Sequence, residues 1–300
     1  MDSGIGDYLL ENRLGFAVGG LIVLIVAGVL TGLIRTVLRE WNFRLTRAGR
    51  GLRRRRGLLT KTDVTLPQRR VQAGVIDTGP VRERFGFHAL KVKSLAGERG
   101  KPGEMAGDHV LAPLARWNEL GPIAEALRWQ LPEETTAWRP VSRAHVWTFL
   151  SVLGPILLLV AGAATAGLLA LPDMTAEDVA RSGLTTAERD AGGLTLIAIL
   201  ALSFFAIMAA LSWLEWKRTL YALEQDRLLI RTGWWTRQTL LLPLRNVQSV
   251  DLQETALGRQ FGVAHVIIGI AGGSWTGHRV PSLPRKEASL LRRDLLSLQA

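Results

Sequence analysis

Four consecutive arginines, Arg53 to Arg56, are the side chains of this sequence with the clearest chemistry. Guanidinium groups stay charged and bind phosphate through paired N–H donors, so a run of them predicts an anionic ligand. Nucleic acid and the headgroups of a phospholipid surface are the two candidates. The chain of 300 residues has a formal charge of +11 and a pI of about 11.0, which agrees with either ligand.

The residue types that usually carry catalysis or metal binding do not form a known pattern. There is no cysteine, and none of the five histidines stands in a metal-binding motif such as H-E-x-x-H. No G-x-S-x-G nucleophile motif occurs. The glycine-rich stretch 269–278 lacks the Lys-Ser/Thr of a phosphate-binding loop. The sequence therefore predicts no catalytic residue, no metal, no cofactor and no enzyme.

Three long apolar runs without charged residues determine how the basic segments are placed. They cover 14–34, 146–171 and 192–214. About 20 residues of helix cross the hydrocarbon core of a bilayer, and soluble helices rarely stay apolar on every face for this length. We therefore predict three transmembrane helices.

The distribution of basic residues predicts the orientation of these helices. Nine arginines and a single acid lie between Arg35 and Arg56, whereas the segment 172–191 is poor in Lys and Arg. By the positive-inside rule, 1–13 and 172–191 lie outside, and the segments 39–140 and 215–300 are cytoplasmic domains.

The two cytoplasmic segments are copies of one another. Shifted by 176 residues, 57–92 aligns without a gap onto 233–268, with about nine identical residues in 36. Each copy reads as short strands with turn residues, followed by a helix at 122–131 or at 284–298. Pro67 and Pro243 should mark a strand end or edge, because proline cannot donate to a ladder. The fold class is thus helical membrane spans plus two mainly β domains, each closed by a C-terminal helix.

Several motifs recur in both copies at matching positions. They are Gly57, Pro67, Arg70, Gln72, Phe85 and Gly86 in the first copy, and Gly233, Pro243, Gln248, Phe261 and Gly262 in the second. With Phe43 to Thr46 at the start, this pattern resembles the bacterial pleckstrin-homology-like (bPH2) domain of YdbS/YdbT-type membrane proteins. The second copy departs from it at Ala222 and Asn246. The resemblance implies two PH-like β-barrels without catalytic residues, in which the shared motifs are mostly structural.

The resemblance also bears on the N-terminus. Longer members resemble three such domains, each preceded by a helix pair, whereas one span precedes the first domain here. Either this chain is part of a longer protein or it has a single anchor, and the sequence leaves both open.

The alignment of the copies predicts which side chains face a ligand. Residues 51–59 align with 227–235, so the arginines belong to a strand, and alternation turns Arg53 and Arg55 outward. Arg54 then falls on the core face, and we group Arg56 with the lipid-facing or partner-facing residues. For Trp234 and Trp235, alternation predicts that one fills the core and the other faces the bilayer or a partner. The alternative is that both are buried.

Two functions compete at this stage. The first is a non-enzymatic adaptor or scaffold of the bacterial cytoplasmic membrane. It would contact anionic lipids, and its partner would be a related PH-like membrane protein or a second copy, bound through the small-residue motifs Gly15-x-x-x-Gly19 and Gly28-x-x-x-Gly32. The second is a membrane-anchored nucleic-acid-binding protein. It is disfavoured because no aromatic residues are interleaved with the basic run.

Overall fold

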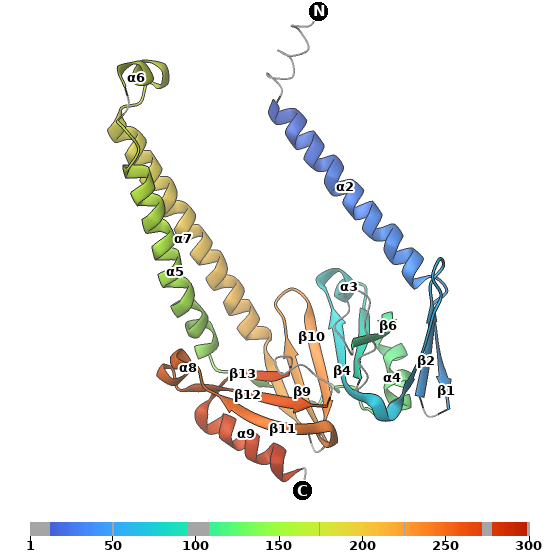
Figure 1. Ribbon diagram of the computed structural model, residues 1–300. Coiled ribbons are helices and arrows are strands. Elements are labelled where there is room, and N and C mark those ends of the chain that lie inside the picture. Colours follow the sequence, from blue (N-terminus) through green and yellow to red (C-terminus); the bar gives the residue numbers. More distant parts are fainter. Residues whose placement is uncertain are drawn as a thin grey trace, which may run out of the picture. The chain divides into compact units, whose positions relative to one another are not determined.

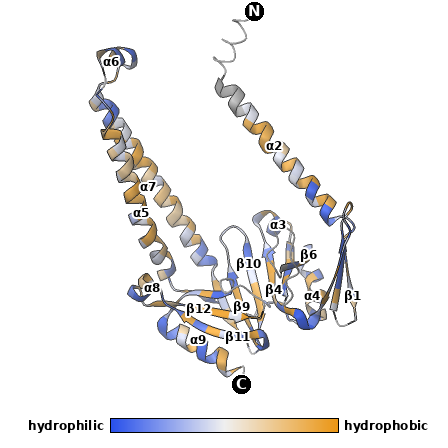
Figure 2. Cartoon of the chain, in the orientation of Figure 1, coloured by the Kyte–Doolittle hydropathy of each residue, from blue (hydrophilic) through white to orange (hydrophobic). Residues whose placement is uncertain are grey.

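Three helices of the computed structural model are long and apolar enough to cross a membrane: α2 (Arg13–Glu40), α5 (Ala144–Leu169) and α7 (Thr186–Arg218). The structure describes residues 13–49, 51–94, 108–173, 175–224, 226–271 and 278–298. The predicted runs 14–34 and 192–214 lie in α2 and α7, and the run 146–171 extends two residues beyond the end of α5; the orange bands of these helices are visible in Figure 2. Helices α5 and α7 pack against each other, and Leu168 lies so close to Gly193 that a Cβ there would approach it to 2.5 Å.

The repeat inferred from the sequence is present in the structure, strand for strand (Figure 1). Adding 176 to the bounds of β2, η1, α3 and β5 gives those of β9, η2, α8 and β12. Copy 1 comprises β1 (Arg44–Ala48), β2 (Gly51–Arg56), β3 (Thr62–Pro67), η1 (Gln68–Arg70), β4 (Val71–Thr78), α3 (Pro80–Arg84), β5 (Phe87–Ser94), β6 (Asp108–Arg116) and α4 (Trp117–Ala126). Copy 2 comprises β8 (Leu220–Leu223), β9 (Arg227–Thr232), β10 (Arg237–Pro243), η2 (Leu244–Asn246), β11 (Val247–Gln253), α8 (Ala256–Gln260), β12 (Val263–Ile270), β13 (Arg279–Pro284) and α9 (Arg285–Ser297).

The chain divides into two compact units, residues 1–68 and 69–300. The first unit contains α2 and the antiparallel sheet β1-β2-β3. The second contains a seven-stranded sheet of order β6-β5-β4-β10-β9-β8-β7, where β7 is Arg139–Pro140, and a three-stranded sheet β11-β12-β13. Pro67 and Pro243 are the last residues of β3 and β10, as predicted.

Copy 2 has one continuous apolar core. Residues from β8 to β13 contribute to it, and α9 adds its buried face of Ala288, Leu291 and Leu295. These three residues recur every three or four positions, so they lie on one side of the helix. The helix predicted for 284–298 is therefore confirmed, and its apolar face is buried.

The helix of copy 1 begins and ends earlier than predicted. Helix α4 runs from Trp117 to Ala126, and Pro122 lies inside it rather than at its start. The start is set by Glu119, whose Oε2 accepts a hydrogen bond from the backbone N–H of Arg116 at 2.8 Å, as the acidic residue of a capping box does. The helix ends because Arg128 takes a left-handed conformation, with φ of 57°, which turns the chain away from the helix axis.

The two copies are joined edge to edge through β4 and β10. These strands pair antiparallel from Gly74 opposite Leu241 to Thr78 opposite Arg237. Asn246 adds a side-chain bond, because its Nδ2 donates to the carbonyl oxygen of Gln72 at 2.7 Å. Three strands of copy 1 and three of copy 2 thus belong to one sheet.

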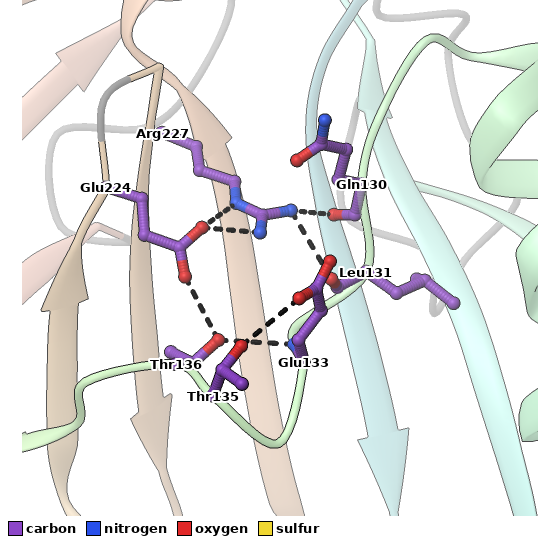
Figure 3. A network of polar contacts seen from close by, with 7 residues as sticks. All are labelled: Gln130, Leu131, Glu133, Thr135, Thr136, Glu224 and Arg227. Atoms are coloured by element: carbon purple, nitrogen blue, oxygen red, sulfur yellow. Dashed lines mark hydrogen bonds and ion pairs between the residues drawn. The ribbon is translucent and has the colours of Figure 1, made fainter.

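The linker after copy 1 is bound to copy 2 by a polar network (Figure 3). Buried Arg227 at the start of β9 donates to Glu224 and to the carbonyl oxygen of Gln130. Thr136 Oγ1 donates to Glu224 Oε1 at 3.0 Å, and the backbone N–H of Glu133 donates to Thr136. The position equivalent to Arg227 in copy 1 is Gly51, so this network belongs to copy 2 alone.

Gly74→Val tests the packing at the junction between the copies. A Cβ at Gly74 would lie 2.5 Å from the Trp129 ring, so valine must displace that ring. We expect the substitution to destabilise the junction by about 1–3 kcal/mol, as overpacking does. Faster hydrogen exchange of the β4 and β10 amides in the full-length protein measures this loss. Gly79→Ala is the control, because its Cβ would meet nothing within 4 Å; equal exchange in both variants would contradict the packing role.

We expect His278 to make the stability of copy 2 sensitive to acid. It is fully buried directly before β13, and burial lowers the pKa of His278 from 6.5 to about 4. The unfolded chain then binds a proton that the folded chain excludes, so the free energy of unfolding should fall as the pH drops from 6.5 toward 4. In His278→Phe this slope should be smaller. A residual slope is expected because burial also lowers the pKa of His265. Equal slopes in chemical denaturation series across this pH range would refute the assignment to His278.

Candidate functional site

The tip of the β2–β3 hairpin closes on the end of α2. Gly57 turns the chain with φ of 108°, where a Cβ would lie 2.1 Å from the carbonyl oxygen of Thr60. The next backbone groups reach the helix: the N–H of Gly57 donates to the Trp41 carbonyl, and that of Leu58 to the Leu38 carbonyl, both at 2.9 Å. The tip thereby satisfies carbonyl groups that a helix end leaves unbonded. Leu58 and Leu59 remain exposed on it, Leu59 by 80%.

The tip of the β9–β10 hairpin also contacts the end of its helix, α7, but here a side chain of the helix is the donor. Gly233 has φ of 102° and the same close approach, here to the carbonyl oxygen of Thr236. Arg218, the last residue of α7, donates to the carbonyl oxygen of Trp234. Each copy therefore holds an apolar pair at the C-terminal end of a helix long enough to span a membrane.

The predicted burial within the tryptophan pair was wrong, while its contact with the bilayer or a partner stays a prediction. Trp234 and Trp235 are both exposed, by 38% and 61%, so neither fills the core and they are not buried together. Strand alternation does not apply because β9 ends at Thr232 and β10 begins at Arg237, which places the pair in the turn. Their ring centroids are 5.7 Å apart, and together they form an aromatic surface on the tip.

The four arginines of β2 alternate between the two faces of the sheet. Arg53 and Arg55 are exposed, as predicted, and both contact Asp63 on β3, at 2.8 Å from Arg53 Nε and 3.2 Å from Arg55 Nε. The hydrogen bond from Arg53 lowers the pKa of the Asp63 carboxyl. Arg54 is only 2% exposed, which places it on the core face that the alignment indicated.

The prediction that Arg56 faces a ligand was wrong. It was expected to face lipid or a partner, but it is buried, and its Nη1 binds Glu40 Oε1 at 2.6 Å. Glu40 is the last residue of α2, so this ion pair fastens β2 to the helix. The sequence placed Glu40 as the single acid among nine arginines, and this isolation was the signal that it has a specific partner.

A small cationic cavity lies beside the first hairpin tip. Its volume is about 180 Å³, and Arg44, Arg55, Arg56 and Lys61 line it together with the Asp63 carboxylate. Arg55 and Arg56 are already paired with Asp63 and Glu40, so Arg44 and Lys61 supply the charge that makes the cavity suitable for an oxyanion such as a phosphate group. Arg44 and Lys61 form no ion pair with any of the residues that the structure describes, so their charges are available to such a ligand.

The shared motifs support the hairpins and turns of both copies. Gly86 and Gly262 have positive φ, 70° and 66°, between a short helix and the next strand. Phe85 and Phe261 are exposed at the ends of α3 and α8. Arg70 and Gln248 are exposed, while Gln72 is buried beside the junction with copy 2. The motif residues outside the tips therefore do not meet at one site.

Glu40→Gln tests the ion pair that holds the first tip. The substitution removes the carboxylate that binds the buried Arg56 guanidinium, so we expect β2 and β3 to lose about 1–3 kcal/mol of protection against hydrogen exchange. Glu177→Gln is the matched control, because its ion pair with Arg181 is exposed on both sides and should contribute at most about 0.5 kcal/mol. Unchanged exchange in Glu40→Gln would show that the pair does not hold the tip.

Comparison with known proteins identifies the repeated domain. The family model for the bacterial PH domain, bPH_2, matches residues 8–128 and 156–299. Comparison with curated proteins and with solved structures gave no match. Each matched region contains one copy of the repeat and its hairpin tip. The chain therefore belongs to the bacterial PH domain family, with the family's region present twice.

Proposed function

We propose that this protein is a non-enzymatic adaptor of the bacterial cytoplasmic membrane. Its two hairpin tips contact the anionic surface of the bilayer. The observation that carries the proposal is the position of these tips. Both present an exposed apolar pair at the C-terminal end of a helix long enough to span a membrane. A residue at the end of a spanning helix lies at the level of the headgroups, where tryptophan is favoured.

The charges around the first tip support the choice of ligand. Arg44 and Lys61 line the cavity beside Leu58 and Leu59, so a lipid phosphate would bind where the apolar pair enters the interface. A basic residue near an anionic bilayer contributes about 1 kcal/mol. At the second tip, Lys217 lies over the Trp213 ring, 4.1 Å from its centroid, at the same end of α7.

The proposed topology follows from the same positions. The three helices cross the membrane, residues 1–13 and 172–191 lie outside, and 39–140 and 215–300 lie in the cytoplasm. Each copy is a PH-like barrel closed by its terminal helix. Gly19, Gly28 and Gly32 of α2 have no atom within 4 Å of an added Cβ, which leaves room for a helix of a related PH-like membrane protein or of a second copy.

Nucleic-acid binding is the less supported function. Two of the four arginines, Arg54 and Arg56, are buried, and Arg53 and Arg55 share the Asp63 carboxylate. The basic run thus offers few free charges to a phosphate backbone.

Full-length protein in lipid nanodiscs tests the lipid contact. Anionic lipid should protect the tip amides 57–61 and 233–236 from hydrogen exchange more than zwitterionic lipid does. In the double variant Arg44→Glu/Lys61→Glu the effect should fall by about 2 kcal/mol at the first tip, following the contribution of each cation. The second tip serves as the internal control and should keep its protection.

Arg292→Glu on α9 provides the matched change of charge, because this exposed side chain lies away from both tips in sequence. It should leave both tips protected. Equal protection in anionic and zwitterionic nanodiscs would refute the lipid contact. Protection of 51–61 by duplex DNA instead would favour the second function.

A further inference from the structure

The pairing of β4 with β10 joins two different edges of the repeated domain. Copy 1 contributes the first strand of its second sheet, and copy 2 contributes the last strand of its first sheet. Such a contact is heterologous, and it leaves the complementary edge of each copy unused. The unused edges are β3 in copy 1 and β11 in copy 2. Each is the terminal strand of a three-stranded sheet in the described part of the chain.

The strands that pair between the copies, β4 and β10, are more buried than their equivalents β11 and β3. Thr239, Leu240 and Leu241 of β10 are buried, whereas the residues at the equivalent positions of β3, 63–65, are exposed or half-buried. Seven of the eight residues of β4 are buried, against two of the seven in β11. Strands that share sequence motifs and position in the fold thus differ in whether a neighbour covers them. An exposed strand edge is a template for pairing with another chain.

We propose that β11 of one chain pairs antiparallel with β3 of a second copy of this chain, so that the protein assembles head to tail in the membrane. The intrachain junction supplies the register. Transferring it by the 176-residue shift places Lys61 opposite Glu254, Thr62 opposite Gln253, and Thr65 opposite Val250. The first of these pairs is between opposite charges, and Lys61 would join the ion pair that Glu254 already forms with Arg285, at 2.6 Å.

A β-bulge at the start of β11 does not prevent this pairing. The register of β11 with β12 shifts between Val247 and Ser249. The register of β4 with β5 shifts at the equivalent residues, Val71 and Ala73. Pairing of β4 with β10 nevertheless proceeds from Gly74 onward, beyond the bulge. Residues 250–254 of copy 2 are the equivalents of 74–78, the residues of copy 1 that pair with β10. Their backbone edge can therefore accept a strand in the same way.

Arg70 occupies the position of the side chain that fastens the intrachain junction. In copy 2 that side chain is Asn246, whose amide donates to the carbonyl oxygen of Gln72. The equivalents are Arg70 and Gln248, and both are exposed. A guanidinium donates the same kind of hydrogen bond, so Arg70 of one chain would bind the Gln248 carbonyl of the next.

The assembly is compatible with anchoring in one membrane. Both copies follow the C-terminal end of a helix long enough to span the bilayer, so repeating the contact between copies keeps every domain on the same side. This strand pairing does not require the hairpin tips to bind lipid.

Cysteine cross-linking of the full-length protein in native membranes tests the pairing. The natural chain has no cysteine, so two introduced thiols report on each other alone. Chains carrying Thr62→Cys are co-expressed with differently tagged chains carrying Gln253→Cys and are then oxidised. We expect a disulfide between the two tags, because Cβ atoms directly opposite in an antiparallel pair lie about 4.5–5.5 Å apart. Arg70→Ala in the first chain should lower the yield of this product.

Thr62→Cys with Ser249→Cys is the mismatched control, four residues along the same strand. It should give about tenfold less product, because thiols whose Cα atoms are more than about 7 Å apart cannot be bridged. Three results would overturn the proposal. The first is a yield no higher than that of this control, and the second is a Gln253→Cys homodimer as the main product. The third is found with a chain that carries both Thr62→Cys and Gln253→Cys: a disulfide that forms within this chain but not between differently tagged chains. Melting temperatures equal to the natural protein's show that the variants fold, so a low yield reports on pairing.

Discussion

The antiparallel pairing of β4 with β10 is the interaction on which the second unit of this protein depends. It turns half of one PH-like copy and half of the next into a single sheet, and it buries strands that would otherwise be open edges. A row of unpaired N–H and C=O groups is costly when covered by anything that cannot bond to it. Pairing with an equivalent strand of a related domain satisfies those groups, and Asn246 and the Arg227 network then hold the linker and the strand end in place.

Hydrogen bonds to backbone carbonyl groups also hold each copy to the helix that precedes it. Helix α2 ends with carbonyl groups that have no partner within the helix, and the first hairpin tip donates to them, whereas at α7 the Arg218 side chain donates to the Trp234 carbonyl of the second tip. Glycine is required at the turn, because both Gly57 and Gly233 approach a carbonyl oxygen too closely for any Cβ. The residues after the glycine are then held outward at the helix end. This explains how a backbone requirement exposes Leu58, Leu59, Trp234 and Trp235 at the level where a membrane interface would lie.

The basic residues of the first copy differ in whether an acidic side chain neutralises them. Arg56 is a fastener, buried against Glu40, whereas Arg44 and Lys61 line a cavity without an ion pair to other described residues. A count of charges along the sequence does not separate these roles. The position of a residue relative to the end of α2 separates them, because a residue must reach Glu40 to form an ion pair with it.

Local patterns of the sequence determined the helices, the repeat and the strand ends. Uninterrupted apolar runs become helices because their backbone bonds are internal, and proline ends β3 and β10 because it cannot donate. Alternation placed Arg53 and Arg55 outward because it is a property of a single strand. The tertiary structure alone decided the rest. The junction of β4 with β10 joins residues more than a hundred positions apart. The hydrogen bond from the Arg116 backbone to Glu119 starts α4 before Pro122, and the turn at Gly233 takes both tryptophans out of the strand alternation. These outcomes depend on which distant groups meet, and a local period carries no information about that.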